Sequence, residues 1–189
     1  MTVIEILESV GLYLDLTDDF KSFSSGTGEI TEEVELEVNK ILKAINNVIE
    51  QLSFNFLNFK TQETVLIEDK NFDLGLLSHK LLKVCSLKIK SNNKKLKFEI
   101  DGNYIKTDFD GYVDIEYFYV PNKVINLNDK ILIDSKISES VFVLGVIAEY
   151  CFINGLFDDA KIWEEKFLKE INKVLKFNKN FYLPKRGWF

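Results

Sequence analysis

The sequence is poor in the residues that disulfide frameworks and metal centres need. Its 189 residues include two cysteines, one histidine and two prolines. Cys85 and Cys151 lie far apart in the chain and form no CxxC pair, so the sequence predicts reduced thiols rather than a disulfide scaffold or a zinc site. Because His79 is the only histidine, no set of imidazole ligands can form, and we expect neither a metal nor a cofactor.

Long apolar runs are missing as well. The longest candidate, Val141 to Ile153, is interrupted by Glu149 and is too short to span a bilayer. The opening residues MTVIEILESVGL hold two glutamates and no basic region, which argues against a signal peptide. We therefore expect a protein that has no membrane partner and that is made and kept in the cytoplasm.

The motifs of the common enzyme classes are also absent: there is no Walker loop, dinucleotide fingerprint, Gly-x-Ser-x-Gly elbow, HExxH or deaminase signature. His79 falls between predicted strands, where a solvated or hydrogen-bonded histidine is expected. Asp114 and Glu116 fall on the polar face of a predicted strand and should be solvated. The sequence predicts that the protein is not an enzyme, since catalysis would need Asp114, Glu116 and His79 to meet in one pocket.

Apolar bulk is what the sequence has in plenty. Apolar residues make up 46% and charged residues 29% of the chain, which is typical of an ordinary folded domain, and the length is close to that of one domain. Sixteen phenylalanines and seven tyrosines indicate large side chains in a core or at a subunit interface. An AT-rich coding bias is the open alternative.

The charges are unevenly distributed. Residues 1–37 are strongly acidic, whereas residues 171–189 contain five basic residues and no acid: Lys173, Lys176, Lys179, Lys185 and Arg186. Such polarity suits head-to-tail contact between copies, or docking of each end on a different partner, because complementary fields orient an encounter. Two solvated faces that never meet are the alternative.

Helical patterns occupy both ends of the chain. The first predicts a helix over residues 2–10 that stops at Gly11, followed by a flexible stretch over residues 22–28. A longer helix should begin near Thr31 and pack lengthwise on another helix, because its apolar positions run close to a heptad seam. These positions are Val34, Val38, Ile41, Ile45, Val48, Ile49 and Leu52.

The middle of the chain has the alternation of strands. Residues 94–100 (KKLKFEI) alternate in polarity and lead into the tight-turn signal Asp101-Gly102, and a second such signal precedes residues 112–120 (YVDIEYFYV). The run KVCSLKIK is the predicted partner of the lysine-rich strand. These segments predict one small antiparallel sheet with one face in water.

An αα-hairpin is predicted after residue 134. The run ISESVFVLGVIAEYCFI is apolar nearly all round, which indicates a buried helix closed by Asn154-Gly155. Asp158 is the predicted N-cap of a second helix over residues 159–177, and the short corner should make the helices antiparallel neighbours. A calcium loop would need oxygen ligands over about a dozen residues, so we expect no metal here.

Together these elements predict an α+β protein, in which a helical bundle carries a small antiparallel β-sheet insertion. The bundle consists of a long helix in the N-terminal half and the αα-hairpin. We predict one domain over residues 1–189. Its parts are a helical segment (1–53), a β-rich insertion (54–133), the αα-hairpin (134–177) and an extended tail (178–189).

The tail, NKNFYLPKRGWF, is too short to form its own core. Exposed rings at such a position are a liability unless a partner covers them, so we predict that the tail docks on another protein, with fraying as the alternative. The residues expected to make this contact are Phe181, Tyr182, Lys185, Arg186, Trp188 and Phe189.

A lysine run in the β-rich segment raises the question of nucleic-acid binding. Its members are Lys80, Lys83, Lys88, Lys90, Lys94, Lys95 and Lys97. The run has no arginine and no aromatic residue before Phe98, and the chain has a net charge of -6. A solvated hairpin is therefore preferred over a phosphate-binding surface.

Three stretches resemble the head-to-tail connector (adaptor) proteins of tailed bacteriophages and prophages. They are GLYLDLTDDF (11–20), YFYVP (117–121) and AEYCFINGLFDDAKIWEEKF (148–167), and the ending KRGWF adds to them. In that family a GLxLxLTDEF-like segment precedes a long helix, a strand-rich insertion ends in a YxYxP-like strand, and a buried helix runs into a similar hairpin. The resemblance spans most of the chain, through packing motifs.

The resemblance implies a ring, commonly twelve-fold, beneath the portal vertex of the filled capsid. The tail would engage the portal protein, a downstream neck or tail protein would bind the other side, and genomic double-stranded DNA would pass through without sequence-specific binding. The protein would then be assembled in the host cytoplasm and reside in the virion at the capsid–tail junction. A helical-repeat interaction module is the alternative, since GLFDDAKIWEEKF is similar to half of a tetratricopeptide unit, but no 34-residue repeat is present.

Overall fold

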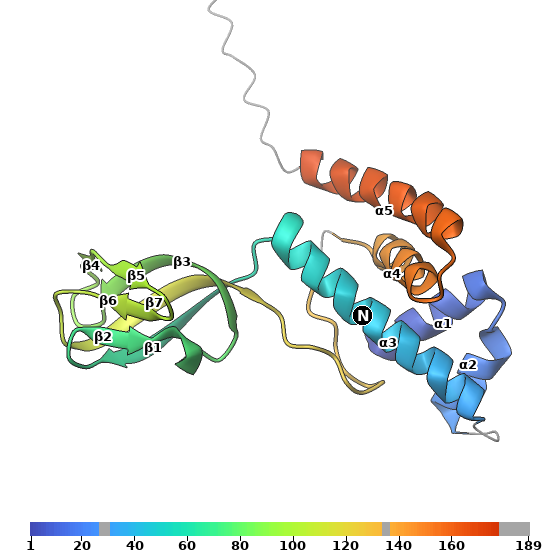
Figure 1. Ribbon diagram of the computed structural model, residues 1–189, viewed down its shortest axis with the longest axis horizontal. Helices are drawn as coiled ribbons and strands as arrows, with labels where there is room; N and C mark the ends of the chain where they lie inside the picture. Colours follow the sequence, from blue (N-terminus) through green and yellow to red (C-terminus); the bar gives the residue numbers. More distant parts are fainter. Residues whose placement is uncertain (27–30, 134–136, 178–189) are drawn as a thin grey trace, which may run out of the picture. The chain divides into compact units, whose positions relative to one another are not determined.

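The computed structural model describes residues 1–26, 31–133 and 137–177, and the chain divides into two compact units (Figure 1). The helical unit consists of Met1–Val48 and the chain from Val124 onward, and the β unit consists of Ile49–Lys123. The predicted α+β class is confirmed. The β unit begins and ends earlier in the chain than the predicted insertion over 54–133, and the prediction of a single domain stays a prediction.

The first helix, α1 (Val3–Leu14), begins where the sequence indicates but ends later. Thr2 and Glu5 form a reciprocal capping box at its start. The predicted stop at Gly11 is wrong, because the helix continues to Leu14 and ends at Asp15 in the left-handed conformation, with φ 60°. Gly11 serves close packing instead, since a Cβ there would lie 2.9 Å from the ring of Phe20.

Phe20 belongs to α2 (Thr17–Ser25), which takes up part of the stretch that the sequence predicts to be flexible. The long helix α3 (Glu32–Asn55) follows, and the hydroxyl of Thr31 accepts a hydrogen bond of 3.3 Å from the Val34 N–H at its start. Its predicted apolar stripe is confirmed from Val38 to Leu52, all of whose members are buried.

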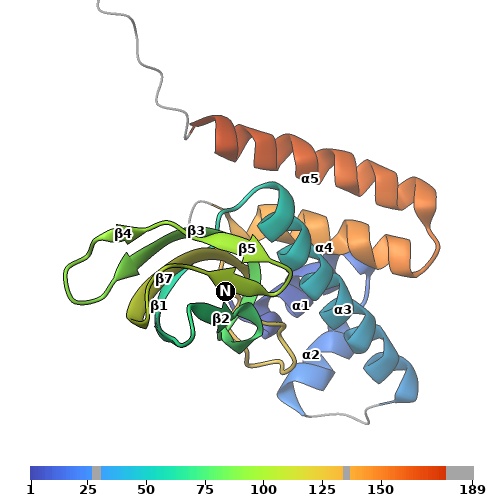
Figure 2. The same cartoon turned by 60° about the vertical axis from the view of Figure 1, so that its left-hand side comes forward.

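The hairpin of α4 (Glu139–Ile153) and α5 (Phe157–Phe177) completes the helical unit (Figure 2). Ser138 caps α4, and the helix is buried on nearly all sides, as predicted. Gly145 allows α5 to come close, because a Cβ there would lie 3.0 Å from the ring of Phe167. The prediction that Asp158 is an N-cap is wrong: α5 begins at Phe157, so both aspartates lie in its first turn.

The β unit contains two antiparallel sheets rather than the single sheet predicted. The four-stranded sheet has the order β1 (Lys60–Ile67), β7 (Gly111–Val120), β3 (Lys80–Ile89) and β4 (Lys95–Leu96). The three-stranded sheet has the order β2 (Asn71–Asp73), β6 (Tyr104–Lys106) and β5 (Glu99–Asp101), and a 3-10 turn (Leu74–Leu76) follows β2. The predicted strand over 94–100 is thus divided between β4 and β5. The predicted turn is confirmed, with Gly102 at φ 58° between β5 and β6.

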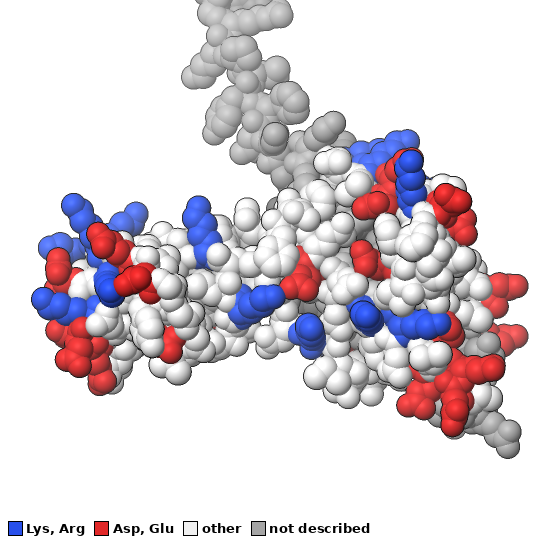
Figure 3. Space-filling model, in the orientation of Figure 1, with Lys and Arg blue, Asp and Glu red and all other residues white. Residues whose placement is uncertain are grey.

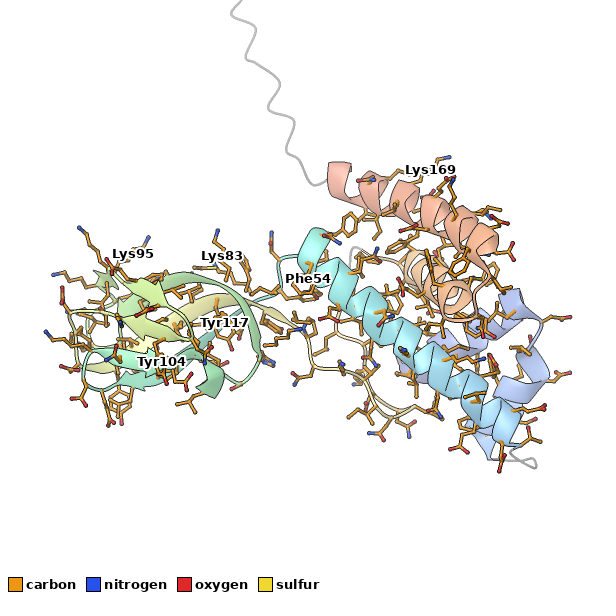
Figure 4. The ribbon with its side chains drawn as sticks, viewed as in Figure 1. Phe54, Lys83, Lys95, Tyr104, Tyr117 and Lys169 are labelled. Carbon is orange, nitrogen blue, oxygen red and sulfur yellow. The ribbon has the colours of Figure 1, made fainter. Side chains whose placement is uncertain are left out.

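Both sheets contribute to one core in the β unit. Its buried members are Ile67, Phe72, Leu74, Leu77, Val84, Leu87, Ile105, Val113, Ile115 and Tyr117. Tyr117 lies inside this unit (Figure 4), and its hydroxyl donates a hydrogen bond to the carboxylate of Glu63. Burial, with Glu63 beside it, raises the Tyr117 pKa above the usual range of a tyrosine, so the phenol stays neutral and donates.

The two thiols are free and lie in different environments. Cys151 is buried in α4, and burial raises the pKa of its thiol, with the charge of Asp159 acting in the same direction. Cys85, in β3, is half-buried. Among the helices of the described chain, none is both long and apolar enough to cross a membrane.

Candidate interaction surfaces

The six residues predicted to dock on a partner lie outside the described residues. They are Phe181, Tyr182, Lys185, Arg186, Trp188 and Phe189, and the structural description ends with α5 at Phe177. Their role in binding therefore stays a prediction.

The corner between α4 and α5 exposes three large apolar side chains. Phe152, Leu156 and Phe157 form this corner patch, and Phe157 is 64% exposed. The rings of Phe152 and Phe157 meet edge to face, with centroids 6.0 Å apart. Neighbouring residues of the same stretch, such as Cys151 and Ala160, are buried between the helices. The stretch 148–167 thus contributes both to packing and to the surface.

The double aspartate at this corner is exposed. Asp158 and Asp159 occupy the first turn of α5, where carboxylates are stabilised by the positive end of the helix dipole. Across the ranges that the structure describes, no three histidine, cysteine, aspartate or glutamate side chains come together as a metal site requires. The carboxylates therefore have a structural explanation in the start of the helix.

A polar network connects α3 with the end of α4. The Lys40 ammonium donates hydrogen bonds of 2.7 Å to Glu37 and to the Asn154 side chain, and the Tyr150 hydroxyl donates to Glu37. Burial alone would raise the Glu37 pKa, but the hydrogen bonds from Lys40 and Tyr150 and the charge of Lys40 hold that pKa below its usual value. Glu37 is therefore ionised at neutral pH.

Beside this network, the helical unit has a pocket of about 370 Å³, which we call the α2–α3 pocket. Its lining comes from the start of α2, the first turns of α3 and one residue of α4: Leu16, Phe20, Glu33, Val34, Leu36, Glu37 and Tyr150. The sequence did not reveal it, because residues 22–28 were predicted to be flexible and α2 was not predicted. The nearest signal was the apolar pair Leu16 and Phe20 at helical spacing.

The surface around this pocket is acidic. Exposed carboxylates come from the start of α2 and from the first turns of α3, and Figure 3 shows them gathered over these two elements. They are Asp18, Glu32, Glu33 and Glu35. Part of the acidic character of residues 1–37 is therefore gathered over the start of α2 and the first turns of α3.

The surface of α5 mixes lysines with acids and includes one aromatic contact with α1. The Lys166 ammonium lies 3.9 Å from the centre of the Trp163 ring, and that ring meets Tyr13 of α1 edge to face at 5.6 Å. Lys169 points outward from α5 in Figure 4. The charge on α5 is therefore mixed, unlike that over α2 and the start of α3.

The lysine run of the β unit is not a uniform cationic face. Lys83 and Lys95 project outward (Figure 4), but Lys80 forms an ion pair of 2.8 Å with Glu50. Lys88 of β3 is paired in register with Asp114 of the neighbouring strand β7, so a carboxylate lies beside it on the adjacent strand. Carboxylates close to the lysines weaken their attraction to phosphate. The surface therefore favours a solvated hairpin over a phosphate-binding surface, as the sequence analysis did.

The residues that an enzyme would need do not converge. His79 stacks on Tyr119 with ring centroids 4.4 Å apart, and its Nδ1 lies 3.4 Å from the Asn122 side-chain oxygen. Asp114 and Glu116 alternate with the buried side chains of β7 and so occupy its opposite face. Catalysis by these three residues would require them to meet in one pocket, and they do not. A non-enzymatic role stays a prediction.

Neither the family models nor the curated proteins compared with this chain give a match. The resemblance to connector proteins therefore depends on the stretches quoted above. The function that it implies stays a prediction.

Proposed function

We propose that this protein is a structural head-to-tail connector of a tailed bacteriophage. Copies form a ring under the portal, twelve in the commonest arrangement of that family, and join the DNA-filled capsid to the neck or tail. The partners are the portal protein, a downstream neck or tail protein and further copies of the chain. Genomic double-stranded DNA passes through the ring without being read, and the ring resides in the virion after assembly in the bacterial cytoplasm.

The observation that carries the proposal is the corner built by residues 148–167. This stretch is the longest of the three that carry the resemblance, and it folds into an antiparallel hairpin whose end exposes the corner patch of Phe152, Leu156 and Phe157. Clustered apolar side chains on a surface are typical of protein contacts. The patch therefore supports a role in which the hairpin packs against a neighbouring protein.

The charge distribution is consistent with the same role. Acids lie over α2 and the start of α3, whereas residues 178–189 are basic and aromatic. A contact that joins two different surfaces of identical subunits is heterologous, and such contacts give rings when the rotation closes. In this role Lys185, Arg186, Trp188 and Phe189 engage the portal.

Mass photometry tests the proposal directly. The full chain is mixed with the portal protein encoded beside its gene and compared with a variant in which Trp188 and Phe189 are replaced by alanine. We expect ring-sized particles attached to the portal for the full chain and loss of attachment for the variant. Replacement of the described surface residue Tyr112 by alanine, in the β unit, is the control and should leave attachment unchanged.

The proposal is wrong if the full chain never binds the portal under conditions in which the portal itself is assembled. A third variant replaces Phe152, Leu156 and Phe157 of the corner patch by alanine. The proposal is also wrong if neither this variant nor the variant without both tail rings binds the portal more weakly than the full chain. Neighbouring genes give an independent check, since portal, capsid and tail genes should lie beside a connector gene.

A further inference from the structure

The α2–α3 pocket combines an apolar floor with an acidic rim. The apolar lining, which we call the floor, includes Phe20, which is 1% exposed, and the half-buried Val34. Leu36, at the edge, is 56% exposed, so a large apolar side chain faces solvent beside the opening. The volume of about 370 Å³ is within the range of pockets that hold small ligands, and it offers room for one large aromatic side chain and part of a neighbour.

Glu33 is the carboxylate of the pocket lining that is suited to a cationic ligand, because Glu37 is already paired with Lys40. Glu33 lies at the exposed start of α3, and Glu37 is held by hydrogen bonds from Lys40 and Tyr150. Further exposed acids come from the start of α2 and the first turns of α3 (Figure 3). A fitting ligand therefore carries an aromatic ring and positive charge close together.

The chain itself contains such a ligand. We propose that the α2–α3 pocket binds the basic-aromatic segment 178–189 of a second copy of this chain, with an aromatic ring on the Phe20 floor and Lys185 and Arg186 beside Glu33. This goes beyond the connector proposal and stands without it. The segment has aromatic side chains, two adjacent cations and no acid, so its charge complements that of the pocket.

Chain length favours a second copy over the same copy. Lys40 contacts Asn154, so the corner before α5 lies near the pocket, and α5 then leads away over 21 residues, about 30 Å. From Phe177, eight residues of fully extended chain reach Lys185 and span about 26–29 Å at most. The tail of the same copy would have to be stretched to its limit, whereas the tail of another copy has no such restriction.

The contact would be head-to-tail, because it joins two different surfaces of the same chain. Such a contact extends to chains or rings of copies. One tail cannot fill a pocket and grip another protein at once, so this contact belongs to the protein before its tail is taken up by a partner. A partner that binds the tail should therefore dissociate the copies.

Sedimentation velocity with charge-reversed variants tests the proposal without any portal. The variants are Glu33→Lys in the pocket and the double change Lys185→Glu and Arg186→Glu in the tail. The control is Glu165→Lys, an exposed position of α5 outside the pocket lining. We expect the full chain to associate as its concentration rises, and the control to associate like the full chain. The association constant of each variant should be at least about tenfold lower.

Mixing the two variants distinguishes a tail that comes from a second copy from the tail of the same copy. Each variant provides the partner that the other lacks, since the intact tail of one meets the intact pocket of the other. We expect an equimolar mixture to regain association. A mixture that stays as weak as its components would overturn the proposal, and so would an original chain that is monomeric at every concentration or variants that associate like the control.

A labelled peptide gives a second readout that does not depend on assembly. A fluorescent peptide of residues 178–189 should bind the full chain and the Glu165→Lys control, and should lose about tenfold in affinity for Glu33→Lys. Equal binding to all three proteins contradicts the pocket assignment. Thermal melting confirms that the variants are folded. Since no portal is present, failure here leaves the connector proposal standing, and failure of portal binding leaves this proposal standing.

Discussion

The Asn46 side chain binds both backbone groups of Val124. It donates a hydrogen bond to the Val124 carbonyl oxygen and accepts one from the Val124 N–H, each 2.9 Å long. It also donates to the Leu42 carbonyl oxygen within α3. Asn46 therefore fixes the chain to α3 at the point where it enters the helical unit.

Replacement of Asn46 by alanine should lower the free energy of unfolding by about 2 kcal/mol, because the backbone groups of the buried Val124 lose their partner. Urea unfolding followed by helical circular dichroism measures the change. The neighbouring Asn47→Ala is the control, since Asn47 makes one hydrogen bond of 3.0 Å with Glu149 and its loss should cost less. Equal costs for the two variants would contradict the role given to Asn46.

Enlargement of Gly145 should destabilise the hairpin. A Cβ at this position lies 3.0 Å from the Phe167 ring, so Gly145→Leu overpacks the contact between α4 and α5 and should cost about 1–3 kcal/mol. Phe167→Ala alone also destabilises, because it leaves a cavity. The double variant should be clearly more stable than the sum of the two single changes predicts. Additive losses, measured by urea unfolding, would show that the two side chains do not meet.

The acid stability of the helical unit should depend on Glu37. Its pKa is lower in the folded chain than the ordinary value of a glutamate, so this group stabilises the fold above about pH 4.3 and loses that effect as the pH falls through the folded value. Tyr150→Phe removes one of its hydrogen bonds and should lower the melting temperature at pH 7 more than at pH 3. Tyr104→Phe, at an exposed position of the β unit, is the control.

Melting curves from pH 7 to pH 3 measure this effect. The loss caused by Tyr150→Phe should shrink as Glu37 becomes protonated. A loss of the same size at both ends of the pH range would mean that the tyrosine acts through packing alone.

Asp158 and Asp159 should stabilise the start of α5 electrostatically. Replacement of both by asparagine should lower stability by about 0.3–1 kcal/mol for each residue at low ionic strength, and the loss should fall as salt is added. Millimolar calcium should leave the melting temperature of the original chain unchanged. A rise of several degrees with calcium would show that the corner binds the ion after all.

The sequence predicted those elements whose residue pattern within a few positions is enough to determine the structure. The all-round apolar run of α4, the Asp-Gly turn after β5 and the stripe of α3 each contain their cause within a few residues. The end of α1 could not be predicted in this way, because Gly11 is needed for contact with Phe20 of the next helix. A glycine that serves packing looks the same in sequence as one that ends a helix.

The helix α2 and the second sheet were not predicted for related reasons. The sequence of α2 contains three serines and few apolar residues, so its helix depends on packing of Phe20 rather than on a periodic stripe. The strands of the second sheet are three residues long, too short to show a period of two. The α2–α3 pocket could not be predicted because one of its walls is α2.

The unequal burial of the two thiols has a practical consequence. A maleimide dye reacts with accessible thiolates, so it should label Cys85 of the β unit first, while Cys151 remains unmodified as long as the helices around it stay closed. The natural sequence thus provides a single attachment point for a fluorophore. The rate at which Cys151 is later modified would then report how fast the helical unit opens.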